Sequence, residues 1–228
     1  MKRLWLAALI ILSAVSCASV DTSATVSVTG SSSVMMDPDI LRFSVTASAL
    51  SESTEEARSI ASGMIESAVT ILGEYGIADE DLITAYISVS PEYSWKDGES
   101  VLAGQRAVYT LEATLRSIPD AADLFSRLSS IDGIEIGQIS ADKEDRRAET
   151  MKARSLAVED AYSKAYVYAN AAGYMLGDLI SISDSSPSSA YASPALYEMA
   201  SPKSGGMEYY PGKISVSDEV HAVYSLSR

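Results

Sequence analysis

The sequence is poor in the side chains that most catalytic and metal sites use. Cysteine and histidine occur once each in 228 residues, as Cys17 and His221. A single cysteine excludes a disulfide within the chain and a redox site built on two of its own thiols. The sequence also lacks a glycine-rich phosphate loop, an H-E-x-x-H motif and a C-x-x-C motif. We therefore assign no cofactor, no metal ligand and no catalytic residue from the sequence.

Long apolar runs are also missing. The run from Leu4 to Val15 is shorter than the roughly 20 residues that a transmembrane helix needs. Because it follows the basic Lys2 and Arg3, it is typical of a secretory signal peptide, which we place at residues 1–16. No later segment has 18 consecutive apolar residues, so we expect the remainder to lie in water outside the cytoplasmic membrane.

Cys17 follows small and aliphatic residues at the end of this run. The order Ala14-Val15-Ser16-Cys17 resembles a bacterial lipobox, although leucine is commoner at the first position. We predict lipid attachment at Cys17, a flexible tether over 17–23 and membrane contact only through the acyl anchor. The alternative is a plain cleavage site with an incidental thiol. Ala18 gives no acidic retention signal, which favours the outer membrane over the inner one.

Basic residues are scarce. Lys and Arg number 17 against 31 Asp and Glu, and the formal net charge is −14. A surface of this sign repels phosphate backbones, so nucleic acid is excluded as an expected partner.

Alternation of apolar and polar residues predicts strands separated by turn residues. The predicted strands cover 25–29, 41–49, 83–93, 107–115, 134–139, 179–182 and 214–226. The first is expected to end at Gly30. Asp97-Gly98 predicts a hairpin, with a loop longer than two residues.

Three segments have helical periodicity. Ser53 and Glu56 form a capping box before an apolar stripe that reaches Tyr75. A short helix follows Pro119, and a long one is predicted from Lys143 to Ala172. In the long helix, alanine recurs at every fourth position, at residues 153, 157, 161, 165 and 169. Such a row of small side chains allows a close approach to a packing partner.

These elements predict an α+β fold. Strands with one polar face indicate an antiparallel sheet, and helices on its other face give a two-layer sandwich. We expect one domain over 24–228 with a single core. Proline, serine and tyrosine interrupt the periodicity over 185–211, which predicts a mobile loop there.

Several local sequences, taken in order, are similar to those of the SIMPL-domain family. They are Val26-Ser27-Val28-Thr29-Gly30 with Pro38-Asp39, Ser90-Pro91-Glu92-Tyr93, Gly104-Gln105-Arg106-Ala107, and Ala153-Arg154 through Asp160-Ala161 with Lys164-Ala165. The resemblance covers about residues 24 to 228. It implies a periplasmic or surface protein, immunogenic in pathogens, associated with oxidative-stress tolerance and in some members a ring- or channel-like homo-oligomer. It implies no catalytic residues.

Some residues remain candidates for chemistry, each with a simpler explanation. His221 falls on the polar face of the last strand and is expected to point to solvent. The acidic run 142–145 could hold a hard cation, or it could complement a helix dipole. Exposed methionines such as Met199 and Met207 could take up oxidant. The tyrosines of the loop, at 191, 197, 209 and 210, could contact a partner or pack on their own domain.

The leading hypothesis is a non-enzymatic envelope lipoprotein that forms homo-oligomers or binds partners, with a possible role in stress tolerance. The alternatives are an envelope hydrolase of unknown substrate and a methionine-based oxidant scavenger.

Overall fold

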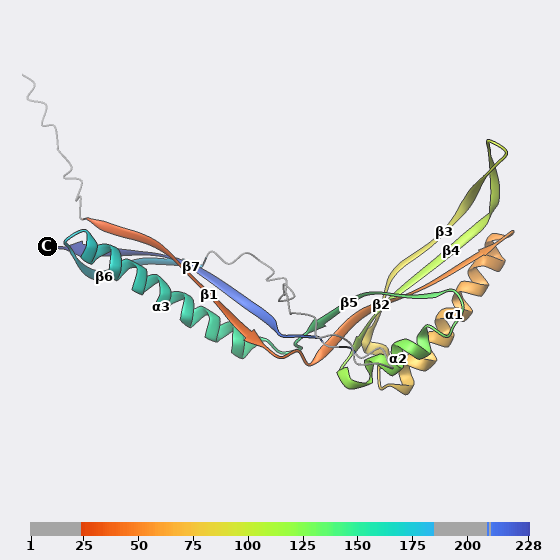
Figure 1. Cartoon of the computed structure of the whole chain (residues 1–228), viewed down its shortest axis with the longest axis horizontal. Helices are drawn as coiled ribbons and strands as arrows, with labels where there is room; N and C mark the ends of the chain where they lie inside the picture. The colour runs from red at the N-terminus through yellow and green to blue at the C-terminus, as the bar shows by residue number, and fades with distance from the viewer. Residues whose placement is uncertain (1–23, 185–208, 210) are drawn as a thin grey trace, which may run out of the picture.

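The computed structural model describes residues 24–184, 209 and 211–228, which form two antiparallel sheets and three α-helices. They are arranged as an elongated body of two lobes (Figure 1). The predicted α+β class is confirmed. The predicted signal peptide, the tether with Cys17 and most of the predicted loop lie outside the described residues, so these assignments stay predictions.

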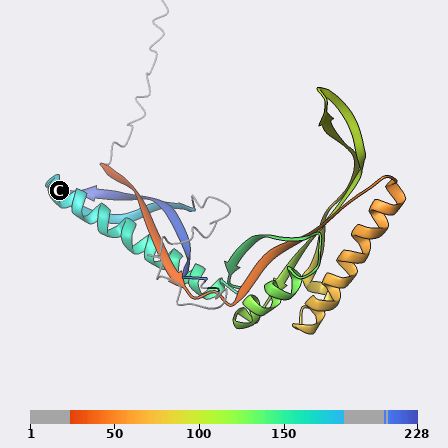
Figure 2. The ribbon, with the colours of Figure 1, turned by 45° about the vertical axis from the view of Figure 1, so that its right-hand side comes forward.

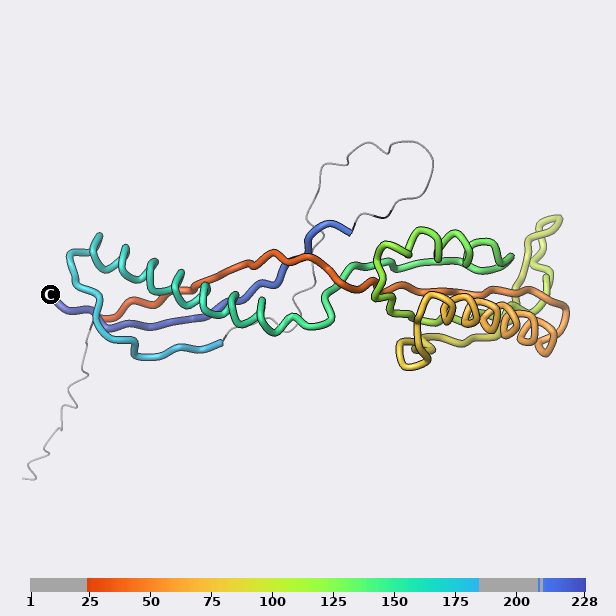
Figure 3. The backbone as a smooth tube through the Cα atoms, turned by 90° about the horizontal axis from the view of Figure 1, so that it is seen from below, coloured from red at the N-terminus to blue at the C-terminus, as the bar shows by residue number. Residues whose placement is uncertain are grey.

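The first lobe combines the two ends of the described chain. Its sheet has the order β1-β7-β6, and α3 covers one face (Figure 3). The elements are β1 (Thr25–Met36), α3 (Arg147–Ala171), β6 (Met175–Asp184) and β7 (Ile214–Ser227). β1 pairs with β7 in unbroken register from Thr25↔Ser225 to Met36↔Ile214.

The second lobe is formed by the continuous segment between β1 and α3. Its sheet has the order β3-β4-β2-β5, with α1 and α2 on the same side (Figure 2). The elements are β2 (Ile40–Ser51), α1 (Thr54–Glu74), β3 (Leu82–Lys96), β4 (Glu99–Leu115), α2 (Ala121–Leu128) and β5 (Ile134–Asp142), with single 3-10 turns at Asp79–Asp81 and Ile118–Asp120.

Of the predicted capping box of α1, the structure shows the Ser53 half, while the Glu56 carboxylate accepts from the Ser51 hydroxyl. The Ser53 hydroxyl accepts a hydrogen bond from the Glu56 amide at 3.2 Å, which satisfies one of the unpaired amides of the first turn. The helix ends before Gly76, whose φ of 78° lies in the left-handed region that glycine adopts without strain.

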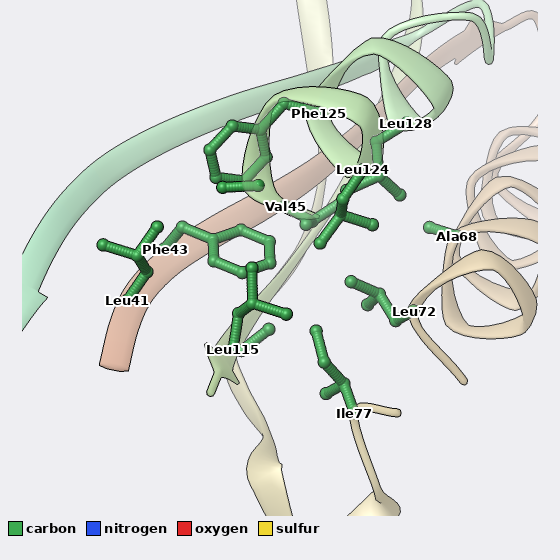
Figure 4. Packing of buried hydrophobic residues seen from close by; sticks show 12 residues of the cluster. Leu41, Phe43, Val45, Ala68, Leu72, Ile77, Leu115, Leu124, Phe125 and Leu128 are labelled. Carbon is green, nitrogen blue, oxygen red and sulfur yellow. The ribbon is translucent and has the colours of Figure 1, made fainter. Parts of the chain in front are cut away.

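The largest apolar cluster lies between α1, α2 and the sheet of the second lobe (Figure 4). Phe43 of β2 meets Phe125 of α2 edge to face, with ring centroids 5.0 Å apart. Leu72 of α1 and Leu115 of β4 close the cluster from the other sides. These contacts fix the helices on β2 and β4, the central strands of the sheet.

The first lobe has a thinner core because α3 approaches its sheet closely. The five alanines of the predicted row are all fully buried, and the first four pack against residues of β1 and β7. Opposite them, a Cβ added at Gly30 would stand 2.7 Å from the Ala161 Cβ and closer still to the Ala157 carbonyl oxygen. The absent side chain at Gly30 and the small side chains of α3 therefore set the distance between helix and sheet.

Four details differ from the sequence prediction. The expected single sheet and core are two sheets with separate clusters, because periodicity shows which face of a strand is buried but not which strand it pairs with. β1 continues through Gly30 to Met36, since this glycine makes room for α3 and does not end the strand.

The other two concern turns. α3 begins at Arg147 and not at Lys143, because residues 143–146 connect the lobes. The hairpin loop has only the two residues Asp97 and Gly98, with φ values of 53° and 86°, as a two-residue turn with both φ positive requires.

Replacing Gly30 with alanine is expected to destabilise the fold by at least the 1–3 kcal/mol typical of overpacking, because backbone atoms of α3 occupy the space of the new methyl group. Gly63→Ala in α1 is the matched control. Nothing lies within 4 Å of its added Cβ, so a gain of about 0.5–1 kcal/mol is expected there. Urea unfolding of both variants measures the difference, and equal stabilities would contradict the close packing of α3.

Candidate functional surfaces

The acidic run 142–145 lies where the chain passes between the lobes, and its acids are held by arginines. The pairs are Asp142 with Arg42 and Arg146, Glu144 with Arg116, and Asp145 with Arg147. Among the described residues, no group of three or more histidine, cysteine, aspartate or glutamate side chains is arranged to hold a metal ion. The run is therefore an ion-pair cluster at the junction of the lobes.

Arg116 lies at the centre of this junction. Its guanidinium donates to Asp81 at 2.6 Å and to Glu144 at 2.7 Å. These hydrogen bonds lower the pKa of both carboxyl groups below their usual values and raise the pKa of Arg116. Asp39 adds two bonds across the junction, donating its amide to the Asp142 carbonyl and accepting from the Glu144 amide. The bonds of Asp39 hold two crossings of the chain between the lobes side by side, residues 37–39 from β1 to β2 and residues 143–146 from β5 to α3.

His221 lies on the exposed face of β7, as predicted, and meets a serine. Its Nε2 is 3.0 Å from the Ser27 hydroxyl on β1. A serine activated by histidine is the core of many hydrolases, in which a third group orients the imidazole. Both side chains lie on an exposed sheet face, and neither lines the two hollows of the second lobe described below. The distance between the two side chains is that of a nucleophile and its base, but the pair is exposed and does not lie in a pocket like those of most active sites.

Asp218 is buried under α3 in a position where β7 otherwise carries apolar side chains. One oxygen lies 3.4 Å from Arg154 Nε, and the other makes no hydrogen bond with the described part of the chain. Ser32, which faces Asp218 across the β1–β7 pair, donates to the Ala153 carbonyl. This polar site ties the start of α3 to the sheet.

Two hollows lie in the second lobe. The larger, about 550 Å³, runs along the polar side of α1 and is lined by Glu55, Arg58, Ser59, Ser62, Gly63, Glu66 and Tyr109. The smaller, about 190 Å³, lies on the sheet face away from the helices, between Arg42, Glu112 and Gln138. Gln138 has a positive φ of 50° beside the irregular pairing of β5 with β2. Both hollows are polar and open.

Each sheet has one edge strand that the described helices leave largely uncovered. α3 packs on β1 and β7 and barely reaches β6, and α1 packs on β2 and β4 and barely reaches β3. No residue of β6 is buried, and its exposed side chains include Leu179, Ile180 and Ile182. β3 exposes Ile83, Tyr86 and Ile87 in the same way.

The hairpin formed by β3 and β4 extends this surface. Its tip projects away from the body of the lobe (Figures 1 and 2). Trp95 near the tip is 79% exposed, and Tyr93, Val101 and Leu102 are exposed beside it. Exposed apolar groups of this size that gather on edge strands are typical of surfaces that bind other proteins.

Of the candidate methionines and tyrosines in the predicted loop, the structure describes only one. Met199, Met207, Tyr191, Tyr197 and Tyr210 lie outside the described residues. Tyr209 packs against the core of the second lobe, and this burial raises its pKa, so this tyrosine contacts its own chain.

The described methionines differ from one another in exposure. Met35, Met151 and Met175 are about half exposed or more, Met36 is buried, and Met64 is half-buried.

Comparison with known proteins places this chain in a family. The family described as "SIMPL: Protein of unknown function (DUF541)" matches residues 26–224, and the chain belongs to it. The uncharacterized protein YggE of Escherichia coli K12 is 28% identical over 200 residues, which cover 86% of this chain and 81% of that protein.

A second relative carries a more descriptive name. The 26 kDa periplasmic immunogenic protein of Brucella melitensis is 24% identical over 166 residues, which cover 71% of this chain and 66% of the relative. Among solved structures, the regulatory subunit of aspartate kinase from Thermus flavus aligns with 85% of this chain and 87% of that one at 11% identity. Its TM-score is 0.19, too low to indicate a shared fold.

The described helices include none that is long and apolar enough to cross a bilayer. This finding covers residues 24–184, 209 and 211–228 only.

Replacing Arg116 with glutamine is expected to lower the melting temperature at pH 6 and to weaken its fall on acidification. Because the folded chain lowers the pKa of Asp81 and Glu144, their contribution to stability is present above the unfolded values of about 4 and is lost as the pH falls through the lower folded values. The variant lacks this contribution. Thermal unfolding at pH 6 and pH 3 measures both effects.

Arg58→Gln is the control, since it removes the same charge from an exposed pair with Glu55 on α1. Its melting temperature should stay close to that of the wild type. If the two variants respond to pH alike, Arg116 does not hold the junction.

Proposed function

We propose that this chain is a lipid-anchored module of the bacterial envelope that acts by self-association and protein binding, without catalysing a reaction. The observation that carries the proposal is the apolar surface on β3, on the β3–β4 hairpin and on β6, which no helix covers. Exposed apolar side chains gathered on edge strands mark surfaces that bind other proteins, and edge strands offer unpaired backbone groups to a further strand.

The envelope location is supported from two directions. The Brucella relative is named a periplasmic protein. The N-terminal sequence has the basic start, the short apolar run and the Ser16-Cys17 junction of an exported lipoprotein. We further propose a role in tolerance of envelope stress, which rests on the resemblance to SIMPL proteins alone.

One observation favours a second candidate function. The Ser27 hydroxyl and His221 Nε2 are at hydrogen-bond distance on an exposed face, so an envelope hydrolase would use Ser27 as its nucleophile and His221 as its base. Loss of a measured hydrolysis in both Ser27→Ala and His221→Ala would support it. A broad ester and amide substrate screen without turnover would remove it.

The exposed methionines keep the oxidant-scavenger alternative testable. Met35, Met151 and Met175 are accessible to peroxide. Equal survival of peroxide by cells with and without the gene would end this alternative.

Light scattering tests the self-association directly. The exported chain with Cys17→Ser, which removes acylation as a source of aggregation, is expected to have a discrete mass above that of one chain at micromolar concentration. Apolar surface on edge strands is the physical reason. A mass of one chain throughout a concentration series up to 100 times higher would contradict the proposal.

Cys17→Ser also tests the anchor. The wild-type chain is expected in the membrane fraction and the variant in the soluble fraction, because two or more acyl chains hold a protein on a bilayer and none remains in the variant. Ser19→Ala, two residues further on, is the control and should stay with the membrane. Equal distribution of all three chains between the fractions would contradict lipid attachment at Cys17.

A further inference from the structure

The two flanks of α3 have different surroundings. On one flank, Asp160 accepts from the Ser31 amide and Lys164 donates to the Thr29 carbonyl, so this row faces β1. On the other flank, Arg154 contacts Asp218 and Tyr162 meets the Tyr224 ring at 6.1 Å, so this row faces β7 and, beyond it, β6. The row toward β6 continues at four-residue spacing through Val158 and Tyr166.

The row toward β6 and the near face of β6 form an uncovered apolar trough. Leu179 and Ile182 lie opposite Tyr224 and Ala222 of β7, whose side chains face α3, so both lie on the helix side of the sheet. Each is 46% exposed, and Tyr162 and Tyr166 on the helix are 53% and 52% exposed. In the described chain, β6 forms the floor of this trough and α3 forms one wall, and no element forms the opposite wall.

Among the residues that the structure describes, no strand pairs with the outer edge of β6. Within the described part of the chain, β6 pairs with β7 alone. Its sequence holds no lysine, arginine or proline, three residues that proteins commonly place on an edge, but it carries Asp178 and Asp184 and pairs irregularly with β7 between Leu176 and Ser181. From Ser181 to Asp184 its pairing with β7 is regular, so the ladder geometry that a further strand needs is present around Ile182.

We propose that β6 pairs antiparallel with β6 of a second copy, about a twofold axis normal to the sheet. The result is a continuous sheet of order β1-β7-β6-β6-β7-β1 with both α3 helices on one face. This inference rests on the self-association proposed above and assigns it a surface. A strand that pairs antiparallel with its own copy satisfies the self-complementarity of a twofold interface.

A second copy fits because it supplies the missing wall. A twofold axis normal to the sheet keeps both helices on the same side, so the row of Tyr162 and Tyr166 from each copy closes the trough above the two β6 strands. At ~200 Å² for a large side chain, the partly exposed Val158, Tyr162, Tyr166, Leu179 and Ile182 of the trough offer roughly 400–500 Å² per copy. This is less than the ~800 Å² per partner of a standard interface and matches the smaller, weaker class, which buries under ~1,200 Å² in total.

Two tyrosines on opposite flanks of α3 give a matched test. Tyr166→Lys places a charge in the trough, whereas Tyr168→Lys places it on the flank that faces β1. The two tyrosines are exposed to a similar extent, 52% and 58%. In chains that also carry Cys17→Ser, light scattering should show at least tenfold weaker association for Tyr166→Lys and for Ile182→Lys, with Tyr168→Lys unchanged.

Single cysteines introduced along β6 test the geometry itself. With Cys17→Ser, cysteine placed at one position at a time from 179 to 183 should form an intermolecular disulfide at one position or at two adjacent ones, where the strand crosses its own copy. A cysteine at Val167, on the exposed crest of α3, should form none.

The outcomes separate the two proposals. An assembly that keeps its mass in Tyr166→Lys and Ile182→Lys and forms no β6 disulfide overturns the β6 interface and leaves self-association standing. A monomer at every concentration overturns both. Protection of the β6 amides from hydrogen exchange in such a monomer would mean that the chain's own segment occupies the edge, and this also overturns the inference.

Discussion

The width of an α-helix limits how much of each sheet this chain can cover. A helix is about 10 Å across and strands lie about 4.8 Å apart, so one helix covers two strands. α3 covers β1 and β7, and α1 covers β2 and β4. β6 and β3 are each one strand further out, and this is why their apolar side chains are exposed. The proposed binding surfaces follow from this single mismatch between helix and sheet.

The close approach of α3 makes the mismatch sharper. Larger residues in place of its alanines would lift the helix from the sheet and let long side chains spread toward β6. Because each buried position of α3 is alanine and residue 30 is glycine, the helix lies close to β1 and β7. Its large apolar side chains, Val158, Tyr162 and Tyr166, are therefore on its exposed flank. The same residues that make the first lobe thin also give it an apolar flank.

The segments that join the lobes are polar, and hydrogen bonds and ion pairs hold them together. Arg116 joins the turn before β3 to the crossing after β5, and Asp39 joins the two crossings to each other. The acids that could have formed a cation site are used in these bonds. Charge at the junction therefore holds the lobes in place, while the apolar surfaces lie on the outer strands of the two sheets.

Much of the fold could be predicted from the sequence because its strands and helices have strong periodicity. Sequence patterns predict the N-cap at Ser53, the buried alanine row and the exposed side of His221, and the structure confirms these three. The division into two sheets was not, since alternation at β1 and β2 says nothing of their partners. The uncovered row of α3 had a signal in the sequence, namely apolar residues on every side of the helix, which a buried stripe alone does not explain.

The candidate surfaces were harder to predict than the fold, because exposure depends on which strand lies at an edge. Trp95 and Leu179 look like ordinary strand residues until the sheet order places them outside the helices. The two partners of Arg116, Glu144 and Asp81, likewise lie 28 and 35 positions away along the chain. The periodicity of the sequence does not predict such long-range contacts.

Hydrogen exchange at two protein concentrations tests the central claim most directly, because it reports on each strand separately. The account predicts that outward amides of β6 and β3 exchange rapidly in dilute protein and become protected at micromolar concentration, while those of β7 and β4 are protected in both. Amides of β6 and β3 that exchange rapidly at both concentrations would contradict the claim that this chain acts through its uncovered strands.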